Sequence, residues 1–212
     1  MLTLYHHPLS ANSRRVWILL LEKNLPFELV ALKLDGDQLQ PKFLELNPFH
    51  QVPVLVDDGF RVVESLAILD YLEAKYPTPP MLPIAPQAVG VVRMVQLLTL
   101  TALRPALIPL TYQMLGTKTY EPQALETARQ EVETVFKFFE QLLGKQRYFG
   151  GEALTLADIT ASTSVLTCHH LDISLQPFAK LQAWCERLLQ RSAWQTTEPS
   201  AETIAAFKQA RS

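Results

Sequence analysis

The 212-residue sequence predicts an α/β domain followed by an all-helical domain. Strand and helix patterns alternate through residues 1–76, five prolines fall within residues 77–86, and the later segments have helical periodicity. A chain of this length accommodates two modest domains. We therefore expect an α/β domain at 1–76, a proline-rich linker at 77–86 and an all-helical domain at 87–212.

Two strands joined by a helix are expected first. The short apolar stretches Leu2–Tyr5 and Pro26–Lys33 are typical of strands, and the apolar run Ser13–Lys23 between them predicts a buried helix. Asn12 or Ser13 is a suitable N-cap for that helix. A strand–helix–strand unit implies that the two strands pair in parallel.

A β-hairpin and a helix complete the first domain. Asp58-Gly59 separates the apolar runs Pro53–Asp57 and Phe60–Val63, and Asp-Gly suits a type I′ turn, which needs positive φ at both positions. A short helix near Pro41–Leu46 precedes the hairpin, and Ser65–Tyr76 follows as a helix. This order is that of a thioredoxin-like domain. A ferredoxin-like split βαβ shares part of it and is the alternative.

The second domain has only helical patterns. Gln87–Leu115 is long and apolar, and Pro105 and Pro109 should kink or interrupt it because each removes a helix hydrogen bond. Pro122–Leu143 carries one apolar face. Further helices are expected at Leu156–Leu171, at Pro177–Gln190 and, in a polar tail, at Ala201–Ala210.

Composition limits the class of protein. The formal net charge is -2 without an acidic or basic block, so the chain lacks the clustered basic face that a phosphate backbone requires. The first residues do not have the pattern of a secretory signal, and the apolar run Val16–Leu21 is too short to span a bilayer. We expect a cytoplasmic protein that binds neither nucleic acid nor membrane.

Metal-binding and disulfide patterns are also absent from the sequence. Cys168 and Cys185 have no second sulfur near them, so neither a disulfide framework nor a C-x-x-C pattern is present. His6 and His7 are adjacent, and adjacent strand residues point to opposite faces. The two histidines after Cys168 lack an i, i+4 partner. No metal site is predicted.

Ser10 lies in the loop Pro8–Arg15, between the first strand and the first helix. Such a loop gathers unpaired N–H groups and the positive end of the helix dipole, which stabilise a thiolate. A serine hydroxyl that donates a hydrogen bond to the thiolate lowers the thiol pKa further. The alternative is that Ser10 and Ser13 only cap the helix.

Pro53 stands at the start of the third predicted strand, in Asn47-Pro-Phe-His-Gln-Val-Pro53-Val-Leu. The cis form of an X-Pro bond costs only about 0.5–1 kcal/mol. A cis Val52–Pro53 bond would turn the main-chain N–H and C=O of Val52 out of the sheet, where a peptide-like ligand could pair with them. A trans proline that starts an edge strand is the alternative.

At Glu64-Ser65 a strand meets the next helix. Ser65 is expected to be the N-cap, so its hydroxyl and the N–H groups that follow suit a carboxylate. Glu64 suits an ammonium group. The pair therefore matches an amino-acid head group, and the alternative is a capping serine beside a solvated glutamate.

Thr155 and Asp158 form the pattern of a capping box, in which each side chain accepts from the other residue's main-chain N–H. Leu154 and Ile159 supply the hydrophobic staple. We interpret this motif as structural.

Together, the order and spacing of these motifs closely resemble the cytosolic glutathione transferase family. The resemblance covers essentially the whole chain and is nearest to the serine-type branch, which is phi- and theta-like and includes bacterial and cyanobacterial members. It implies glutathione as co-substrate, no other cofactor and a homodimer. The residues that carry it are Tyr5–Ser10 before Arg15-Val, Asn47–Leu55, Glu64-Ser65, Ala67–Leu72 and Thr155–Asp158.

The resemblance also implies roles for single residues. Ser10 would be the catalytic group that donates a hydrogen bond to the glutathione sulfur. Val52 would pair with the cysteinyl backbone, and Glu64 with Ser65 would hold the γ-glutamyl end. The implied glutathione contacts are Gln38, His50, Gln51, Val52, Pro53, Glu64 and Ser65.

The chain departs from the family pattern at two sites and follows the pattern of some classes at a third. Phi-like members hold the glycyl carboxylate with a His-Lys pair, where this chain has Gln38 and Leu39. Many members have glycine before Gln-Val-Pro, where this chain has His50. In some classes an aromatic residue nearby enters the partner subunit, and Phe49 is that residue here.

The implied reaction is attack of the glutathione thiolate on a small hydrophobic electrophile. Lowering a thiol pKa of about 8.5 by about two units, roughly 2.7 kcal/mol, makes thiolate the majority species at pH 7. Leu9, Leu107 and Tyr112 are expected to line the electrophile pocket. Alternatives are a glutathione-dependent peroxidase or isomerase on the same site, a thiol-disulfide oxidoreductase, which would need a cysteine in place of Ser10, and a non-catalytic interaction module.

Overall fold

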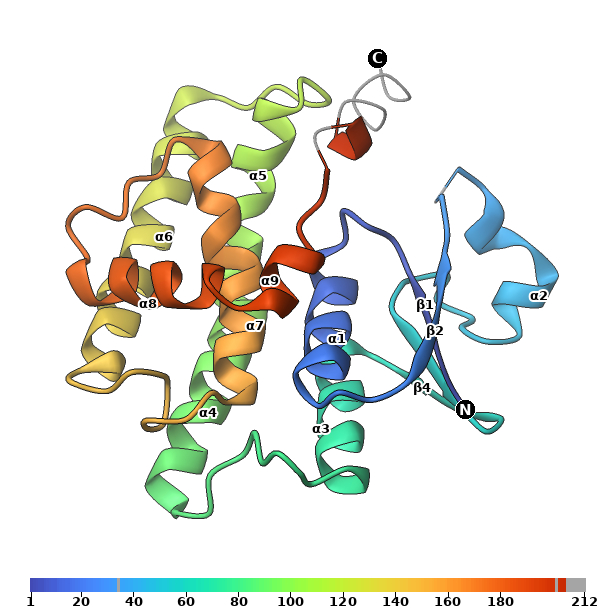
Figure 1. Cartoon of the computed structure of the whole chain (residues 1–212). Helices are drawn as coiled ribbons and strands as arrows, with labels where there is room; N and C mark the ends of the chain where they lie inside the picture. The colour runs from blue at the N-terminus through green and yellow to red at the C-terminus, as the bar shows by residue number, and fades with distance from the viewer. Residues whose placement is uncertain (34, 201, 205–212) are drawn as a thin grey trace. The chain divides into compact units, whose positions relative to one another are not determined.

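The computed structural model describes residues 1–33, 35–200 and 202–204. The described chain divides into two compact units (Figure 1). The first unit is Met1–Pro80 together with Ser192–Thr203, and the second contains Met81–Arg191. The sequence analysis had assigned residues 192–203 to the helical domain.

A four-stranded mixed sheet with the order β2-β1-β3-β4 forms the centre of the first unit. β1 (Leu2–His6) pairs in parallel with β2 (Phe27–Ala31) and antiparallel with β3 (Val54–Asp57). β4 (Phe60–Val63) pairs antiparallel with β3. The parallel pair and the hairpin are both as predicted, and the thioredoxin-like fold class is confirmed.

Helices cover the sheet on both sides. α1 (Ala11–Glu22) and α3 (Ser65–Lys75) lie on one face, and α2 (Pro41–Leu44) lies on the other (Figure 1). A single 3₁₀ turn, Asp37–Leu39, precedes α2. Buried side chains of α1, α3 and the strands form the larger core: Leu4, Val16, Ile18, Leu19, Leu20, Leu55, Ile68, Leu69 and Leu72.

The hairpin turn follows from two residues. Asp58 and Gly59 have φ values of 48° and 86°, so both central positions are left-handed, as a type I′ turn requires. Asparagine, aspartate and glycine tolerate this region better than other residues. The Asp-Gly pair therefore fixes the register of β3 and β4.

Lys23 holds the end of α3 and the first linker residues in place through hydrogen bonds to their main chain. Its ammonium is buried and donates hydrogen bonds to the carbonyl oxygens of Tyr76 (2.8 Å) and Pro79 (2.7 Å). It also forms an ion pair of 2.7 Å with Glu73. Two carbonyl oxygens therefore accept from this ammonium, and the Glu73 carboxylate balances its charge. The end of α3 and the first linker residues are thus tied to the end of α1.

The second unit is helical. In chain order its elements are α4 (Pro86–Leu98), a π-helical segment (Thr99–Leu103), α5 (Arg104–Met114), α6 (Pro122–Leu143), α7 (Leu156–Val165), a 3₁₀ segment (Leu166–Leu171) and α8 (Ala179–Leu189). α9 (Ser192–Thr196) belongs to the first unit. Of the predicted tail helix Ala201–Ala210, only residues 202–204 are described, and these are helical.

The α-helical pattern of the long apolar stretch is interrupted at the first of its two prolines, where the π-helical segment Thr99–Leu103 precedes Pro105. Pro105 has no N–H to donate to Thr101, so an α-helical hydrogen bond is missing at the start of α5. The N–H of Arg104 instead donates to the carbonyl of Thr99, five residues earlier, which is π-helical geometry. Pro109 lies inside α5.

One described helical stretch, Pro86–Met114, is long and apolar enough to cross a membrane by length and composition. A single stretch of this kind is weak evidence for a membrane span, because core helices of soluble proteins meet the same criteria. α7 is the most buried helix of the second unit, with every residue from Leu156 to Val165 buried.

Candidate functional site

Three loops of the first unit are attached at one edge of the sheet. Tyr5 pairs with Val54, and Val54 pairs with Val63. The chain therefore leaves β1, enters β3 and leaves β4 at the same end of these strands. The loops at this edge carry the three predicted glutathione motifs, which lie far apart in the sequence.

Ser10 is the N-cap of α1, whereas the sequence analysis favoured Asn12 or Ser13. Its backbone is extended (φ -81°, ψ 110°), and its Oγ accepts a hydrogen bond of 3.3 Å from the N–H of Ser13. Capping occupies an oxygen lone pair and leaves the hydroxyl proton available. Capping and donation to a thiolate are therefore compatible at Ser10, which is half-buried.

Ser13 differs from Ser10 in exposure. It is completely buried, and its Oγ accepts a long hydrogen bond of 3.4 Å from the N–H of His7. A side chain in this position faces the protein interior. Of the two serines in the loop, only Ser10 is accessible to a ligand.

The Val52–Pro53 peptide bond is cis, as the family resemblance implies. Within residues 1–33, 35–200 and 202–204, neither the N–H nor the carbonyl oxygen of Val52 has a hydrogen-bond partner. Val52 thus offers one main-chain donor and one acceptor beside the start of β3.

Asn47 shapes the loop before Val52. Its buried side chain donates 2.8 Å to the carbonyl of Gln51 and accepts 3.0 Å from the N–H of Phe49. His50 lies between these contacts, exposed, with a left-handed φ of 47°. Gln51 is also exposed. Their roles toward glutathione stay predictions.

Glu64 is the N-cap of α3, so the expectation that Ser65 caps this helix is wrong. Glu64 is exposed and has φ 69° and ψ 116°, a strained region for a residue with a side chain. Ser65 is the first helical residue and only 3% exposed. No pattern in the sequence signals the positive φ, because glutamate has no preference for it.

A buried guanidinium links the starts of α1 and α3. Arg15 is completely buried, and its Nη1 donates to Asn12 Oδ1 (2.7 Å) and to Ser65 Oγ (3.4 Å). Two helix N-termini and this positive charge therefore meet at one sheet edge. Both raise the local potential, which favours a bound anion.

The other predicted contacts are placed as follows. Gln38 lies in the 3₁₀ turn, where its Oε1 accepts 3.1 Å from the N–H of Gly36. Leu9 is half-buried next to Ser10. On α5, Leu107 is buried and Tyr112 is 41% exposed. The roles of the last three toward an electrophile stay predictions.

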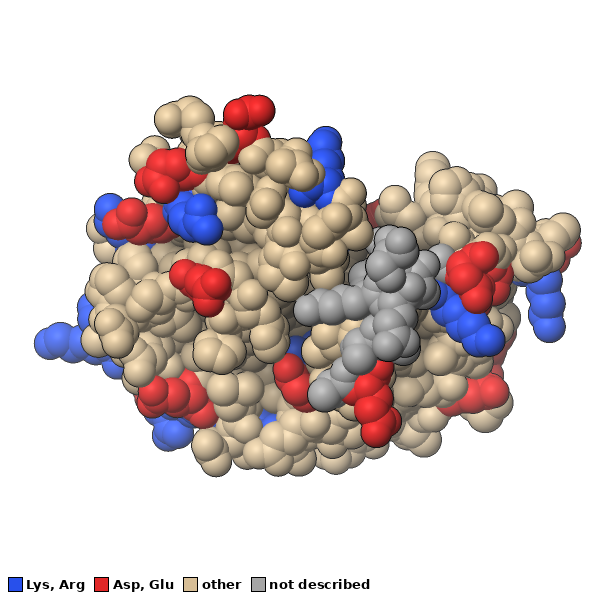
Figure 2. Space-filling model, turned by 90° about the horizontal axis from the view of Figure 1, so that it is seen from above, with Lys and Arg blue, Asp and Glu red and all other residues tan. Residues whose placement is uncertain are grey.

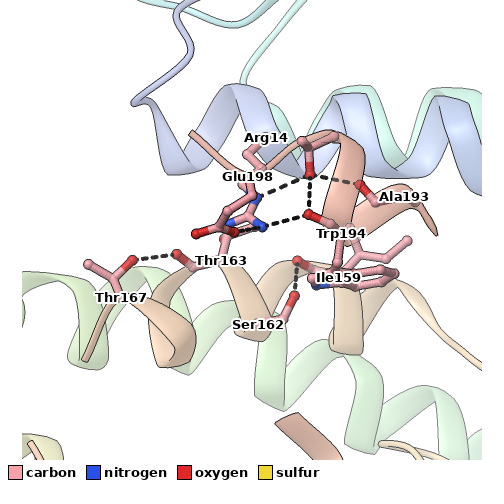
Figure 3. A network of polar contacts seen from close by, with 9 residues as sticks. Arg14, Ile159, Ser162, Thr163, Thr167, Ala193, Trp194 and Glu198 are labelled. Carbon is pink, nitrogen blue, oxygen red and sulfur yellow. Dashed lines mark hydrogen bonds and ion pairs between the residues drawn. The ribbon is translucent and has the colours of Figure 1, made fainter. Parts of the chain in front are cut away.

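Arg14 joins α1 to the end of α9, a connection that no local sequence pattern indicates (Figure 3). Its guanidinium donates to the carbonyl of Trp194 (3.1 Å) and to Thr197 Oγ1 (3.1 Å), and it forms an ion pair with Glu198. Burial lowers the pKa of Arg14, and Glu198 acts in the opposite direction. These contacts explain why residues 192–203 group with the first unit.

His6 lies on the face of β1 that α1 covers. Burial, with a smaller effect of His7, lowers the pKa of His6 to about 4, so the imidazole is neutral at pH 7. Its ring contacts Trp17 edge to face, with centroids 5.2 Å apart. Among the described residues, no group of three or more His, Cys, Asp or Glu is placed to hold a metal ion.

Charge is mixed on the face drawn in Figure 2, where Lys and Arg side chains alternate with Asp and Glu. This distribution agrees with the formal net charge of -2. It contains no continuous basic stripe of the kind that nucleic-acid-binding proteins present.

Comparison with known proteins places the chain in a family. Residues 4–80 match the model of the glutathione S-transferase N-terminal domain, and residues 94–192 match that of the C-terminal domain. Maleylacetoacetate isomerase of Rattus norvegicus is 31% identical over 199 residues, which are 92% of this chain and 91% of that protein. Glutathione S-transferase D7 of Drosophila melanogaster is 32% identical over 188 residues, 86% of this chain and 82% of that protein.

A solved structure agrees with these matches. The delta-class glutathione transferase of Nilaparvata lugens superimposes with a TM-score of 0.85 at 26% identity, covering 100% of this chain and 98% of that one. Fold and sequence together define a two-domain glutathione transferase architecture. The chain belongs to the glutathione S-transferase family, and it is an enzyme of that family.

Proposed function

We propose that this enzyme conjugates glutathione to small hydrophobic electrophiles, and that Ser10 donates a hydrogen bond to the glutathione thiolate. The observation that carries the proposal is the hydrogen bonding of the Ser10 hydroxyl. Its oxygen caps α1 through the N–H of Ser13, at 3.3 Å, and its proton is available at a half-buried position. This assignment makes the chain a serine-type member of the family.

The tripeptide would bind along the same sheet edge. The N–H and carbonyl of Val52, which have no partner among the described residues, would bind the cysteinyl backbone as an added strand. Ser65 and the start of α3 would hold the γ-glutamyl carboxylate, and exposed Glu64 its ammonium. Gln38, His50, Gln51 and Pro53 complete the proposed contacts.

Thiolate formation is the step that Ser10 promotes. One charge-assisted hydrogen bond and a helix N-terminus lower a thiol pKa, and about two units, roughly 2.7 kcal/mol, suffice at pH 7. The thiolate sulfur then attacks the electrophilic carbon. A carbon–sulfur bond forms, and in a substitution the leaving group departs with its electron pair.

Two serine variants test the proposal in a pH–rate profile with 1-chloro-2,4-dinitrobenzene. Ser10→Ala should lower kcat at neutral pH and raise the apparent pKa towards that of free glutathione, because the lost bond favoured only the thiolate. Ser13→Ala should shift this pKa less. If Ser13→Ala shifts the pKa and Ser10→Ala does not, the wrong serine is assigned. If neither does, the helix terminus alone activates the thiol.

Isomerisation is the second candidate activity. It is favoured by one observation, the identity of 31% and 30% with the maleylacetoacetate isomerases of Rattus norvegicus and Mus musculus. The test compares turnover of maleylacetoacetate with turnover of the chlorodinitrobenzene by the same preparation. A much higher kcat/KM for maleylacetoacetate would make isomerisation the main activity.

We also propose a cytoplasmic homodimer. Phe49 is 63% exposed beside the proposed glutathione loop, and a large exposed aromatic side chain is typical of an interface anchor. Sedimentation should give twice the chain mass of 24.0 kDa, and Phe49→Ala should weaken the dimer. A monomeric wild type at micromolar concentration contradicts the proposal, and cell fractionation tests the location.

A further inference from the structure

His7 makes three hydrogen bonds to the loop that carries Ser10. Its carbonyl accepts 2.9 Å from the N–H of Ser10, and its own N–H donates 3.4 Å to Ser13 Oγ. Its imidazole Nδ1 accepts 3.2 Å from the N–H of Leu9. The side chain is buried. One residue therefore contacts the loop at Leu9, at Ser10 and, in the first turn of α1, at Ser13.

The hydrogen bond from the N–H of Leu9 to Nδ1 determines which nitrogen of the His7 ring carries the proton. A ring nitrogen that accepts a hydrogen bond carries no proton, so His7 holds its proton on Nε2 when this contact is formed. Without the acceptor, the N–H of Leu9 would be an unpaired donor in a half-buried loop. Buried main-chain donors are almost always paired, because leaving one unpaired costs about 1–3 kcal/mol.

The contact has the geometry of an Asx-turn. In such a turn, the side chain of residue i accepts from the N–H of residue i+2 and fixes the main chain between them. His7 and Leu9 have this spacing, with an imidazole nitrogen in place of the Asn or Asp oxygen. Asparagine at position 7 can therefore supply the same acceptor, and phenylalanine can fill similar space without one.

We propose that His7 is a positioning residue for thiolate formation. Its imidazole holds the N–H of Leu9, and the loop so fixed presents the Ser10 hydroxyl to the glutathione sulfur. The inference rests on the proposed role of Ser10. A displacement of about 1 Å at a reacting group can reduce rate about 100-fold, so loss of this contact has a measurable effect on activation.

The experiment compares His7→Phe, His7→Asn and Ser10→Ala in the full-length enzyme. The readouts are kcat, the KM for glutathione, the apparent thiol pKa from the pH–rate profile, and the melting temperature. His7→Phe should lower kcat about tenfold and raise the apparent pKa, with a KM for glutathione within about twofold, because the proposed contacts at Val52 and Ser65 remain. His7→Asn should restore most of kcat and the wild-type pKa.

Each other outcome is decisive. A wild-type pKa in His7→Phe overturns the inference, and so does an equal pKa shift in His7→Phe and His7→Asn, because the acceptor would then be irrelevant. If His7→Phe does not fold, His7→Asn decides alone: a wild-type pKa supports the inference and a shifted one overturns it. No shift in Ser10→Ala overturns the proposed role of Ser10, whereas a shift there without one in His7→Phe overturns only the role of His7.

Discussion

Trp184 donates a hydrogen bond of 2.8 Å from its indole Nε1 to Oδ1 of Asp158, and both side chains are completely buried. Oδ1 also accepts from the N–H of Phe149 (2.9 Å), and Oδ2 accepts from the N–H of Thr155 (2.7 Å). The predicted capping box of Thr155 and Asp158 is therefore formed. Two donors outside α7, the N–H of Phe149 and the indole of Trp184, also bind the Asp158 carboxyl. This carboxyl therefore has a structural role beyond helix capping.

Asp158→Ala should reduce stability much more than activity per folded molecule. The change leaves the indole of Trp184 and the main-chain donors of Phe149 and Thr155 unpaired in the core. Each unpaired buried donor costs about 1–3 kcal/mol, so the free energy of unfolding should fall by about 3 kcal/mol or more. Denaturant titration with an active-site count checks this. An unchanged transition midpoint contradicts it.

The pH dependence of stability should reveal the state of Asp158. Burial raises its pKa to about 6, against the hydrogen bonds that favour the carboxylate. The hydroxyl of Thr155 lies 2.8 Å from Oδ2 and 2.9 Å from the carbonyl of Phe149 but has one proton for both. A protonated Asp158 donates to Thr155 Oγ1, and Thr155 can then donate to Phe149.

A raised folded pKa means that the folded state binds more protons than the unfolded chain. The contribution of Asp158 to stability is therefore full below about pH 4 and is lost as pH rises through about 6. Relative to Asp158→Asn, the wild type should lose roughly 2–3 kcal/mol between pH 4 and pH 7. Urea titrations of both proteins at four pH values measure the difference. A constant difference means that the carboxyl is ionised throughout.

Arg14→Met should destabilise the enzyme by about 2 kcal/mol or more, because the carbonyl of Trp194 and the hydroxyl of Thr197 lose a buried charged donor. Glu198→Gln is the matched control. The Glu198 side chain is 48% exposed, so its ion pair should contribute less than about 1 kcal/mol. Equal losses in thermal denaturation would show that the ion pair, not the hydrogen bonds, holds α9 to α1.

Ser65→Ala should raise the KM for glutathione about tenfold or more, since a hydrogen bond to a charged group contributes about 1.5–3 kcal/mol. The Oγ of Ser65 accepts from Arg15, so its proton is available for the γ-glutamyl carboxylate. Ser162→Ala is the control, a buried serine of the second unit whose Oγ donates to the carbonyl of Ile159. An unchanged KM in Ser65→Ala would place the head group elsewhere.

Ser10→Cys should gain weak thiol-transferase activity. A cysteine at the N-cap of α1 has a depressed pKa, because the helix terminus stabilises its thiolate. With glutathione disulfide, this thiolate displaces one glutathione as the leaving thiolate and forms a mixed disulfide. Intact mass spectrometry should find one added glutathionyl group that dithiothreitol removes. Label on Cys168 or Cys185 only would contradict this.

Local patterns in the sequence predicted the fold well. Alternation, the Asp58-Gly59 turn and the prolines after residue 76 act over a few neighbouring residues, and the β-α-β and β-β-α units follow from them. Contacts between distant residues were not predictable in this way. Arg14 reaches Trp194 across 180 positions, and Trp184 reaches Asp158 across 26, so no local rule could join them.

In the candidate site, too, the motifs were predictable from the sequence and the detailed contacts were not. The Ser10 loop, the segment around Pro53 and Glu64-Ser65 were recognisable as a set from their order and spacing, and the family resemblance then implied the cis bond before Pro53. The N-caps of α1 and α3 were misplaced by one to three residues because neighbouring residues compete for the cap position. The proposed role of His7 depends on one imidazole nitrogen, and nothing in the residue type distinguishes His7 from His6 in the sequence.

The distribution of tryptophan offers a spectroscopic view of folding. Trp17 and Trp194 lie in the first unit, and Trp184 lies in the second. The emission of a tryptophan moves to longer wavelength when water reaches the indole, so each unit has an intrinsic fluorophore of its own. Trp17→Phe with Trp194→Phe isolates the signal of the second unit, and Trp184→Phe isolates that of the first. The two reporters make cooperativity between the units directly measurable, without an added label.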